Sequence, residues 1–377
     1  WIFSDQHRAQ AMGCSGDVNA HTPNLDRMAG SCITGIGGSP LCSPFRGSVL
    51  TSQYPHACIP GHDLPLPDGS KTVAHAFNDA GYQTSWFGKW HVDGRENRDE
   101  DTRSGHHHVR RDRRGGFDTW IGYENNNAQF DCWVHGHDRT GDEVDLYKLD
   151  GYETDKLTDL LIDDLSVHDK DEPFFSVLAF QPPHSPYDAP QEFLDRYDPA
   201  EMELRPNVPP VERVLTESKA SLAGYYGMIE NLDWNVGRVL EAVEAEGLAE
   251  NTYVIYFSDH GDMHGSHGRI LKCVPLEESI RIPFVVSGPR VRAGEHGSGG
   301  QGEKPGLINH VDIGPTSLGL CGIEKPEWMV GFDYSGCYVE GREAPAEMPD
   351  SAFLQLVDPG FRYGFAPDRE RPWRGVV

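Results

Sequence analysis

The chain has little positive charge and no long apolar run. Its 33 lysines and arginines face 59 acidic residues, which gives a formal net charge of −26 at pH 7. Such a charge argues against a nucleic-acid backbone or an anionic membrane surface as a partner. No apolar run approaches about 18 residues, so we expect no membrane-spanning helix. Any anionic ligand must therefore be bound in a local basic pocket.

The eight cysteines include no Cys-x-x-Cys pair. This absence excludes a zinc ribbon and a thioredoxin-like motif, but it leaves disulfides open and indicates no compartment. The sequence also lacks an initiator methionine, so we expect any signal peptide to lie upstream, in which case the protein is periplasmic or secreted. A length of 377 residues allows one large α/β domain or two smaller ones.

Apolar segments of strand and helix length alternate along the chain. Residues 222–243 carry apolar side chains with a 3.6-residue period, which predicts a long amphipathic helix. Residues 72–80 predict a shorter helix that Gly81 ends. We expect strands at residues 1–3, 82–87, 174–180 and 252–257. This alternation predicts an α/β fold.

Polar residues suited to chemistry follow each predicted strand. They are Asp5 and Gln6, Lys89 and His91, His184, and Asp259 and His260. The carboxyl ends of parallel strands form the ligand-binding edge of an α/β sheet, so we expect these side chains to converge there. Lys89 and His91 are expected on one side of an extended segment. Each group also has an ordinary interpretation as a loop residue, and for Asp5 loop capping is the stronger one on local evidence.

The segment 42–46 reads Cys-Ser-Pro-Phe-Arg. We expect a helix to begin at Arg46, which would place Cys42 near unpaired backbone N–H groups and the positive end of the helix dipole. Such a position suits a group that handles an anion. A buried structural thiol is an equally good interpretation of these residues alone.

Residues 92–150 form a polar, nearly structureless run on the sequence evidence. Histidines and arginines are concentrated at 106–114, which indicates a solvated loop or a rim that attracts a polyanionic substrate. Further on, Lys272 precedes Glu277, Glu278 and Arg281, and the last three could form a structural ion-pair network.

Several segments resemble the type I sulfatases, the formylglycine-dependent branch of the alkaline phosphatase-like superfamily. The pattern at 42–46 resembles the family signature, although Ser52 stands where the family usually has glycine. Four further segments resemble family blocks in the same order, at residues 22–26, 81–91, 182–186 and 258–262. The resemblance covers residues 1 to about 316.

The resemblance implies an alkaline-phosphatase-like α/β/α sandwich with a large mixed, mostly parallel sheet. Residues 1–330 would form the catalytic domain. We expect residues 331–377 to begin a smaller C-terminal subdomain, most of which is absent from this chain, and residues 361–364 and 371–374 to lead toward another strand. The implied activity is hydrolysis of a sulfate ester, on a sulfated carbohydrate or an aryl sulfate.

The same resemblance implies a role for each site residue. A maturation enzyme would convert Cys42 to Cα-formylglycine, whose hydrated aldehyde is the nucleophile. One divalent metal, Ca²⁺ in preference to Mn²⁺ or Mg²⁺, would be held by Asp5, Gln6, Asp259 and His260. Arg46 and Lys89 would steady the aldehyde hydrate and the developing charge. His184 and Lys272 would grip the sulfate and protonate the leaving alkoxide, while His91 would act as the base that releases sulfate.

Two other functions remain open. Asp5-Gln6 together with Asp259-His260 also resembles the phosphonate monoester and phosphodiester hydrolases of the same superfamily. Gln6 stands where many sulfatases carry a second aspartate, although an amide oxygen can also bind a hard cation. The third function is a non-catalytic anion-binding relative, in which Cys42 stays unmodified.

Overall fold

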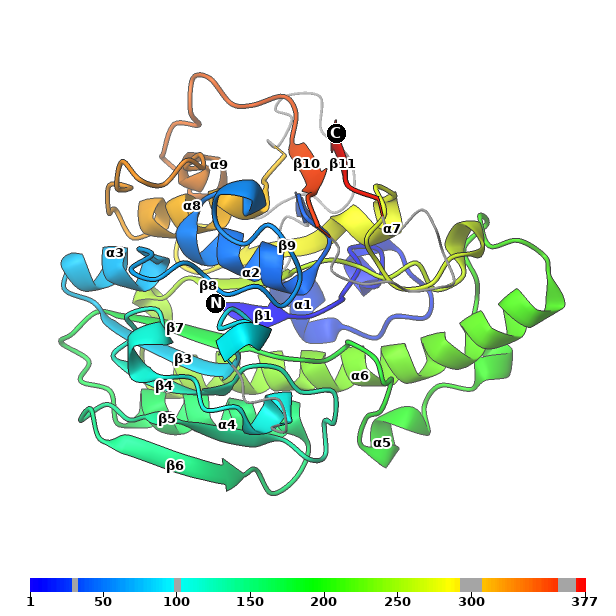
Figure 1. Ribbon diagram of the computed structural model, residues 1–377, viewed down its shortest axis with the longest axis horizontal. Helices are drawn as coiled ribbons and strands as arrows, with labels where there is room; N and C mark the ends of the chain where they lie inside the picture. Colours follow the sequence, from blue (N-terminus) through cyan, green and yellow to red (C-terminus); the bar gives the residue numbers. More distant parts are fainter. Residues whose placement is uncertain (29–32, 98–102, 292–306, 359–370) are drawn as a thin grey trace.

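A nine-stranded sheet runs through the protein, and helices cover both of its faces (Figure 1). The computed structural model describes residues 1–28, 33–97, 103–291, 307–358 and 371–377. The strand order is β2-β9-β8-β1-β7-β3-β4-β5-β6. The strands are β1 (Ile2–Ser4), β2 (Ile33–Ile36), β3 (Gln83–Lys89), β4 (Thr119–Tyr123), β5 (Trp133–His137), β6 (Glu143–Lys148), β7 (Phe174–Ala179), β8 (Val254–Ser258) and β9 (Arg281–Ser287). The five central strands are parallel, and the two strands at each edge pair antiparallel.

Successive residues of the central strands contribute to two separate cores. In β1, Phe3 packs with the helices on one face and Ile2 with those on the other. The first face is covered by α2 (Cys42–Thr51), α3 (Val73–Asp79) and α8 (Ile313–Leu320), and the second by α1 (Pro23–Met28), α4 (Glu153–Ser166) and α6 (Glu212–Ala245). Burial on both faces explains why these strands read as almost continuous apolar runs. The short helices are α5 (Gln191–Leu194), α7 (Glu277–Ile280) and α9 (Ser335–Tyr338).

The predicted central elements are confirmed. Strands β3, β7 and β8 lie where the apolar runs predict them, and α6 covers the predicted amphipathic stripe while beginning ten residues earlier. Helix α3 ends before Gly81, whose φ of 83° is the left-handed conformation expected after a helix. The ion pair between Arg281 and Glu277 is present, and Glu278 pairs with Arg205.

Helix α2 begins at Cys42, so the prediction that it begins at Arg46 is wrong. Pro44 occupies the third helical position. Proline is tolerated in the first turn because the N–H group that it lacks would have no partner inside the helix. The earlier start makes Cys42 the first residue of the helix.

Residues 92–150 are not structureless, because they supply β4, β5 and β6. Most side chains of β6 are exposed, so this edge strand lacks the apolar pattern that identifies a buried one. The basic segment forms short 3₁₀ turns, and two of its arginines are buried in ion pairs, Arg113 with Asp93 and Arg114 with Glu143. These two arginines serve the fold rather than a substrate rim.

Gly88 sets the path by which the chain leaves β3. Its φ is 108°, and an added Cβ would lie 2.1 Å from the carbonyl oxygen of Ala179 in the neighbouring β7. Only glycine permits this close approach of two backbones. The close pairing of the strands fixes Lys89, the next residue, at the carboxyl edge of the sheet.

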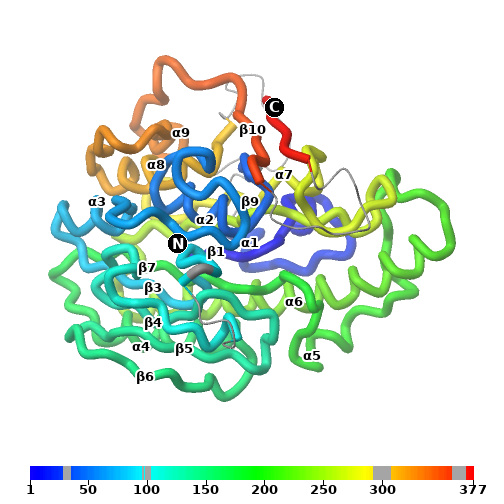
Figure 2. Tube along the Cα trace, viewed as in Figure 1, coloured from blue at the N-terminus to red at the C-terminus, as the bar shows by residue number. Residues whose placement is uncertain are grey.

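A second, two-stranded sheet pairs β10 (Phe353–Leu356) with β11 (Trp373–Val376), which confirms a strand after residue 371. In Figure 2 these orange and red segments lie beside the blue segment that leads into α2, and Leu356 packs against Leu41, the residue before Cys42. Residues 361–364 lie outside the described residues. The domain boundary at residue 330 stays a prediction. Among the described residues, no helix is both long and apolar enough to cross a membrane.

Candidate active site

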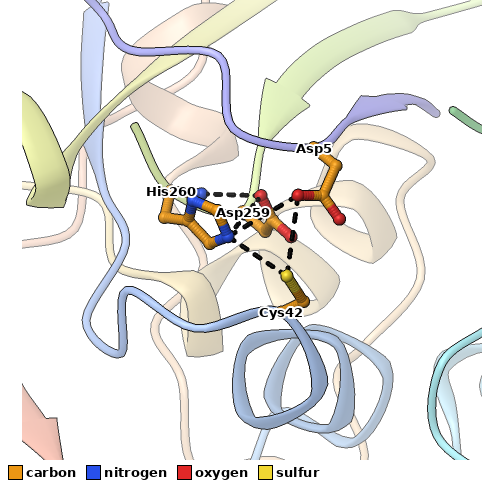
Figure 3. Close-up of side chains that lie close together, drawn as sticks. All are labelled: Asp5, Cys42, Asp259 and His260. Carbon is orange, nitrogen blue, oxygen red and sulfur yellow. Dashed lines mark hydrogen bonds and ion pairs between the residues drawn. The ribbon is translucent and has the colours of Figure 1, made fainter. Parts of the chain in front are cut away.

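Four buried side chains from three distant segments meet at the start of α2. Figure 3 shows Asp5, Cys42, Asp259 and His260 pointing toward one another. Asp5 follows β1, while Asp259 and His260 follow β8, which pairs parallel with β1. The carboxyl ends of the two strands therefore deliver these side chains to one edge of the sheet, as predicted.

The four side chains are close enough to share one ion. The Cys42 Sγ lies 3.2 Å from His260 Nε2 and 3.6 Å from Asp5 Oδ1. His260 Nε2 lies 3.5 Å from Asp259 Oδ1. One potential ligand atom from each residue lies within 4.8 Å of all the others, and all four residues are buried. Two carboxylates and an imidazole are a donor set that fits a divalent cation.

Arg46 contacts this cluster and the end of β3 through its guanidinium group. It lies one turn after Cys42 in α2, and its Nη1 donates a hydrogen bond to the Lys89 carbonyl oxygen at 2.7 Å. Its Nη2 donates to Asp5 Oδ2 at 3.4 Å, and its guanidinium lies 4.3 Å from the ring centroid of Phe3. The guanidinium thus connects the cluster to the ends of β1 and β3, and its side chain is fully buried.

The two aspartates differ in pKa. Burial opposes ionisation of Asp5, but Lys89, whose Nζ donates to Asp5 Oδ2 at 2.6 Å, and neighbouring cationic and imidazole groups hold its pKa well below the usual range. For Asp259, burial and then the charge of Asp5 raise the pKa to about 7. The Oδ2 atom of Asp259 is buried and has no hydrogen-bond partner, and its ion pair with Arg46 Nε is long, at 4.0 Å. A buried carboxylate oxygen without a partner is unfavourable unless a cation satisfies it.

Gln6 lies beside the cluster, but its side chain is engaged elsewhere. Its backbone N–H donates to Asp259 Oδ1 at 3.0 Å. The side-chain Nε2 donates to Asp262 at 2.7 Å, and Oε1 accepts from Lys272 Nζ at 2.8 Å. In this arrangement the amide oxygen faces an ammonium group, so its role as a metal ligand stays a prediction.

A pocket of about 560 Å³ opens above Cys42. Its lining includes five of the six predicted catalytic residues, namely Cys42, Lys89, His91, His184 and Lys272. It also includes four polar residues that the sequence interpretation missed, namely His62, Asp63, Asn125 and Asn127. The two asparagines follow the end of β4, so the same strand-end argument would have found them if that strand had been recognised.

Lys272 and His184 form a pair in which the lysine holds the proton. Lys272 Nζ lies 2.7 Å from His184 Nε2, while His184 Nδ1 lies 2.6 Å from the Ser185 carbonyl oxygen. A carbonyl can only accept, so Nδ1 carries the ring proton and Nε2 accepts from the lysine. Burial and then the charge of Lys272 lower the pKa of His184 to about 3. Burial opposes the charge of Lys272, yet Cys42 and the aspartates raise its pKa.

His91 is held by Asp63. Its Nε2 donates to Asp63 Oδ1 at 2.9 Å, and its buried Nδ1 has no hydrogen-bond partner. Burial and then the charge of Lys89 lower the pKa of His91 to about 4, so the ring is neutral at pH 7. The expected extended segment is wrong at this point, because His91 has a left-handed φ of 56°. The turn nevertheless leaves both Lys89 and His91 on the pocket wall.

The model of the Sulfatase family matches residues 1–323. The chain belongs to the sulfatase family. This sulfatase-family chain is 34% identical to the ulvan-active sulfatase of Formosa agariphila over 356 residues, which cover 89% of this chain and 63% of that protein. It therefore spans less than two thirds of the length of this relative.

Solved structures confirm the predicted fold. A structure from work on the metabolism of multiple glycosaminoglycans by Bacteroides thetaiotaomicron matches 100% of this chain and 83% of its own, at a TM-score of 0.82 and 26% identity. The phosphonate monoester hydrolase of Silicibacter pomeroyi matches 100% of this chain and 87% of its own, at a TM-score of 0.74 and 20% identity. The second likeness shows a shared fold alone.

The cluster beside Cys42 leads to a prediction about metal binding. We expect Asp259→Asn to lose a bound divalent metal, because the change removes one of two carboxylate ligands. In the wild-type protein the affinity should rise from about pH 6 to 8, since Asp259 must ionise to bind a cation. Elemental analysis after dialysis measures the metal content, with the exposed Asp171→Asn as the matched control. Unchanged metal content in Asp259→Asn, or active wild-type protein without metal, would contradict the assignment.

Proposed function

We propose that this chain hydrolyses sulfate esters, with residue 42 as the nucleophile. The observation that carries the proposal is the position of Cys42. It lies at the first residue of α2 and on the pocket surface, between the carboxylate cluster and the cationic side chains of Lys89 and Lys272. A nucleophile, a cation site and anion-binding groups are therefore gathered around one point.

The unmodified thiol is a poor nucleophile in this environment. Burial and then the charge of Asp5 raise the pKa of Cys42 to about 12, so almost no thiolate exists at pH 7. This property, together with the Cys-Ser-Pro-Phe-Arg segment, supports conversion of Cys42 to Cα-formylglycine by a maturation enzyme. The hydrated aldehyde would supply a hydroxyl nucleophile at this position.

A divalent cation would be held by Asp5, Asp259 and His260, with Gln6 as the proposed fourth ligand. The Oδ2 of Asp259 supports this assignment, because it accepts no hydrogen bond and its ion pair with Arg46 Nε is long, at 4.0 Å. Carboxylate and amide oxygens outnumber the single imidazole, which favours Ca²⁺ or Mg²⁺ over Mn²⁺, and of these we propose Ca²⁺. The cation would supply Lewis-acid polarisation of a sulfate oxygen.

The lysines would bind the sulfate and stabilise charge that develops on its oxygens. Lys89 and Lys272 both line the pocket, and both are almost completely buried, so their charges are weakly screened by water. Arg46 does not line the pocket but donates to the Lys89 carbonyl and to Asp5. Its proposed role is therefore to orient these two residues.

Lys272 and His184 would supply the proton for the leaving alkoxide. Because His184 is neutral at pH 7, the proton resides on Lys272 Nζ, 2.7 Å from His184 Nε2. Lys272 Nζ would donate this proton to the alkoxide directly or through His184 Nε2, because the Nδ1–H of His184 stays bonded to the Ser185 carbonyl oxygen. The pair would thus fill the acid role that the resemblance implies for both residues.

His91 would act as the base that restores the nucleophile. Its Nε2–H donates to Asp63, so the neutral ring carries its lone pair on Nδ1. That atom is buried and has no partner, and it is therefore available to accept a proton. Asp63 would hold the ring in this tautomer.

The proposed substrate is a sulfated carbohydrate or an aryl sulfate. His62, Asp63, Asn125 and Asn127 give the pocket wall groups that can bind sugar hydroxyls. Glycosaminoglycan metabolism, named for one structural neighbour, agrees with a sugar substrate. Phosphonate monoester hydrolysis is the second candidate, because Asp5-Gln6 with Asp259-His260 fits that branch and one neighbour with this fold has the activity.

Parallel assays of matched aryl esters test the proposed activity. We expect protein produced with the maturation enzyme to hydrolyse an aryl sulfate faster than the corresponding aryl phosphonate monoester. Cys42→Ala should abolish turnover, because the variant has no convertible side chain, and should keep the wild-type circular dichroism spectrum. A faster reaction with the phosphonate would instead favour phosphonate monoester hydrolysis as the function. Sulfate binding without turnover by protein with a converted residue 42 would show a non-catalytic relative.

The proposed acid and base predict different responses to the leaving group. Positioned proton transfer contributes about 10²- to 10⁴-fold in rate. We expect His184→Ala to lose activity of this order for sulfate esters of poorly acidic alcohols and much less for an activated nitrophenyl ester. His91→Ala should slow both kinds of ester equally. Steady-state kcat over a series of alcohols measures this difference, and the exposed His56→Ala is the control. Equal dependence of both variants on leaving-group pKa would contradict the division of roles.

A further inference from the structure

A second group of metal-binding side chains lies on the pocket wall, apart from the cluster beside Cys42. It consists of His62, Asp63 and His91. Asp63 Oδ1 lies 2.9 Å from His91 Nε2 and 3.3 Å from His62 Nε2. The two imidazole rings are perpendicular, at 89°, with centroids 5.1 Å apart. Two ring nitrogens thus approach one carboxylate from different directions.

This geometry is close to that of a tetrahedral zinc site. Zinc binds histidine nitrogen and carboxylate oxygen at about 2.0–2.2 Å, which places neighbouring donors about 3.3 Å apart. The His62 to Asp63 separation already has this value, and the His91 to Asp63 separation would need to open by a few tenths of an ångström. One donor atom from each residue lies within 4.8 Å of the others, so the ring nitrogens of His62 and His91 can also approach to this distance.

The protonation states suit a metal as well. Burial and then His91 lower the pKa of His62 well below its usual value, and the pKa of His91 is about 4. Both rings are therefore neutral at pH 7. Metal binding at Nε2 would require a shift of each ring proton to Nδ1.

We propose that His62, Asp63 and His91 form a second metal site, which binds a divalent ion of the zinc class and inhibits the enzyme when it is filled. The ion would bind His91 at Nε2. The ring proton would then lie on Nδ1, so this atom could no longer accept a proton as a base. The binding claim is independent of the proposed function, whereas the claim of inhibition depends on it. Three protein ligands would leave a fourth position open to the pocket.

The two sites differ in the metals that they prefer. Two imidazoles and one carboxylate favour zinc over calcium, which binds oxygen ligands. The cluster of Asp5, Asp259 and His260 has more oxygen donors, but an unmodified Cys42 would add a thiolate that also attracts zinc. Asp63 gives the second site an entry path, because 38% of its side chain is exposed.

Zinc titration of the full chain tests the second site. Calorimetry in saturating Ca²⁺, on a Cys42→Ala background that removes the thiolate, should show one bound Zn²⁺. Adding His62→Ala should abolish this binding, and adding Asp63→Asn should weaken it at least tenfold. Adding the exposed His56→Ala should leave it unchanged, and so should Asp259→Asn, which alters only the first cluster.

Each outcome decides the proposal. Absence of zinc binding, equal binding in the His62→Ala variant, or loss of binding with Asp259→Asn would overturn the second site. Circular dichroism shows whether each variant is folded, and the isosteric Asp63→Asn tests the site if His62→Ala does not fold. In active protein, zinc should inhibit aryl sulfate turnover reversibly, with a chelator restoring the rate. Zinc binding at this site without inhibition would overturn the claim about His91 while leaving the site in place.

Discussion

The buried carboxylate of Asp5 is the constraint on which the site depends. Its two oxygens contact cations and donors from three segments, with Lys89 at 2.6 Å and Arg46 at 3.4 Å. An isolated charge in a fully buried position is strongly unfavourable, so each of these groups requires the others. Loss of Asp5 would remove the carboxylate that Lys89 contacts and would leave Arg46 with only its longer ion pair to Asp259, at 4.0 Å. The network therefore holds the start of α2 against the ends of β1 and β3, and with it the position of Cys42.

The same network explains how an acidic protein can bind an anion. The chain carries a net charge of −26, yet the pocket presents two buried lysines and three histidines that are neutral at pH 7. Burial weakens the screening of the lysine charges and keeps the imidazoles uncharged. As a result the basic groups that line the pocket differ in charge. The lysines carry protons, and the histidines can accept them.

Much of the fold and part of the site could be predicted from the sequence, for physical reasons. Strands β7 and β8 are buried on both faces, so their apolar runs are continuous and end abruptly at polar residues. Those ends identified Asp259 and His184. The edge strand β6 is exposed and shows no such run, so β4 to β6 were missed together with Asn125 beyond β4.

Other features depend on contacts between distant segments. His62 and Asp63 reach His91 only because the loop after α2 folds against the end of β3. No periodic pattern in the sequence indicates that contact. Gln6 was correctly placed beside Asp259, but the sequence could not show that Lys272 engages its amide oxygen. The start of α2 was misplaced because proline in a first turn resembles a helix boundary.

We propose that residue 42 becomes the nucleophile only after its thiol is converted. Peptide mass spectrometry across residues 42–46, applied to preparations made with increasing amounts of the maturation enzyme, measures the converted fraction of each sample. We expect aryl sulfate turnover per mole of protein to rise in proportion to this fraction and to fall to zero where the thiol is intact. Full turnover by protein that retains an intact Cys42 thiol would contradict it.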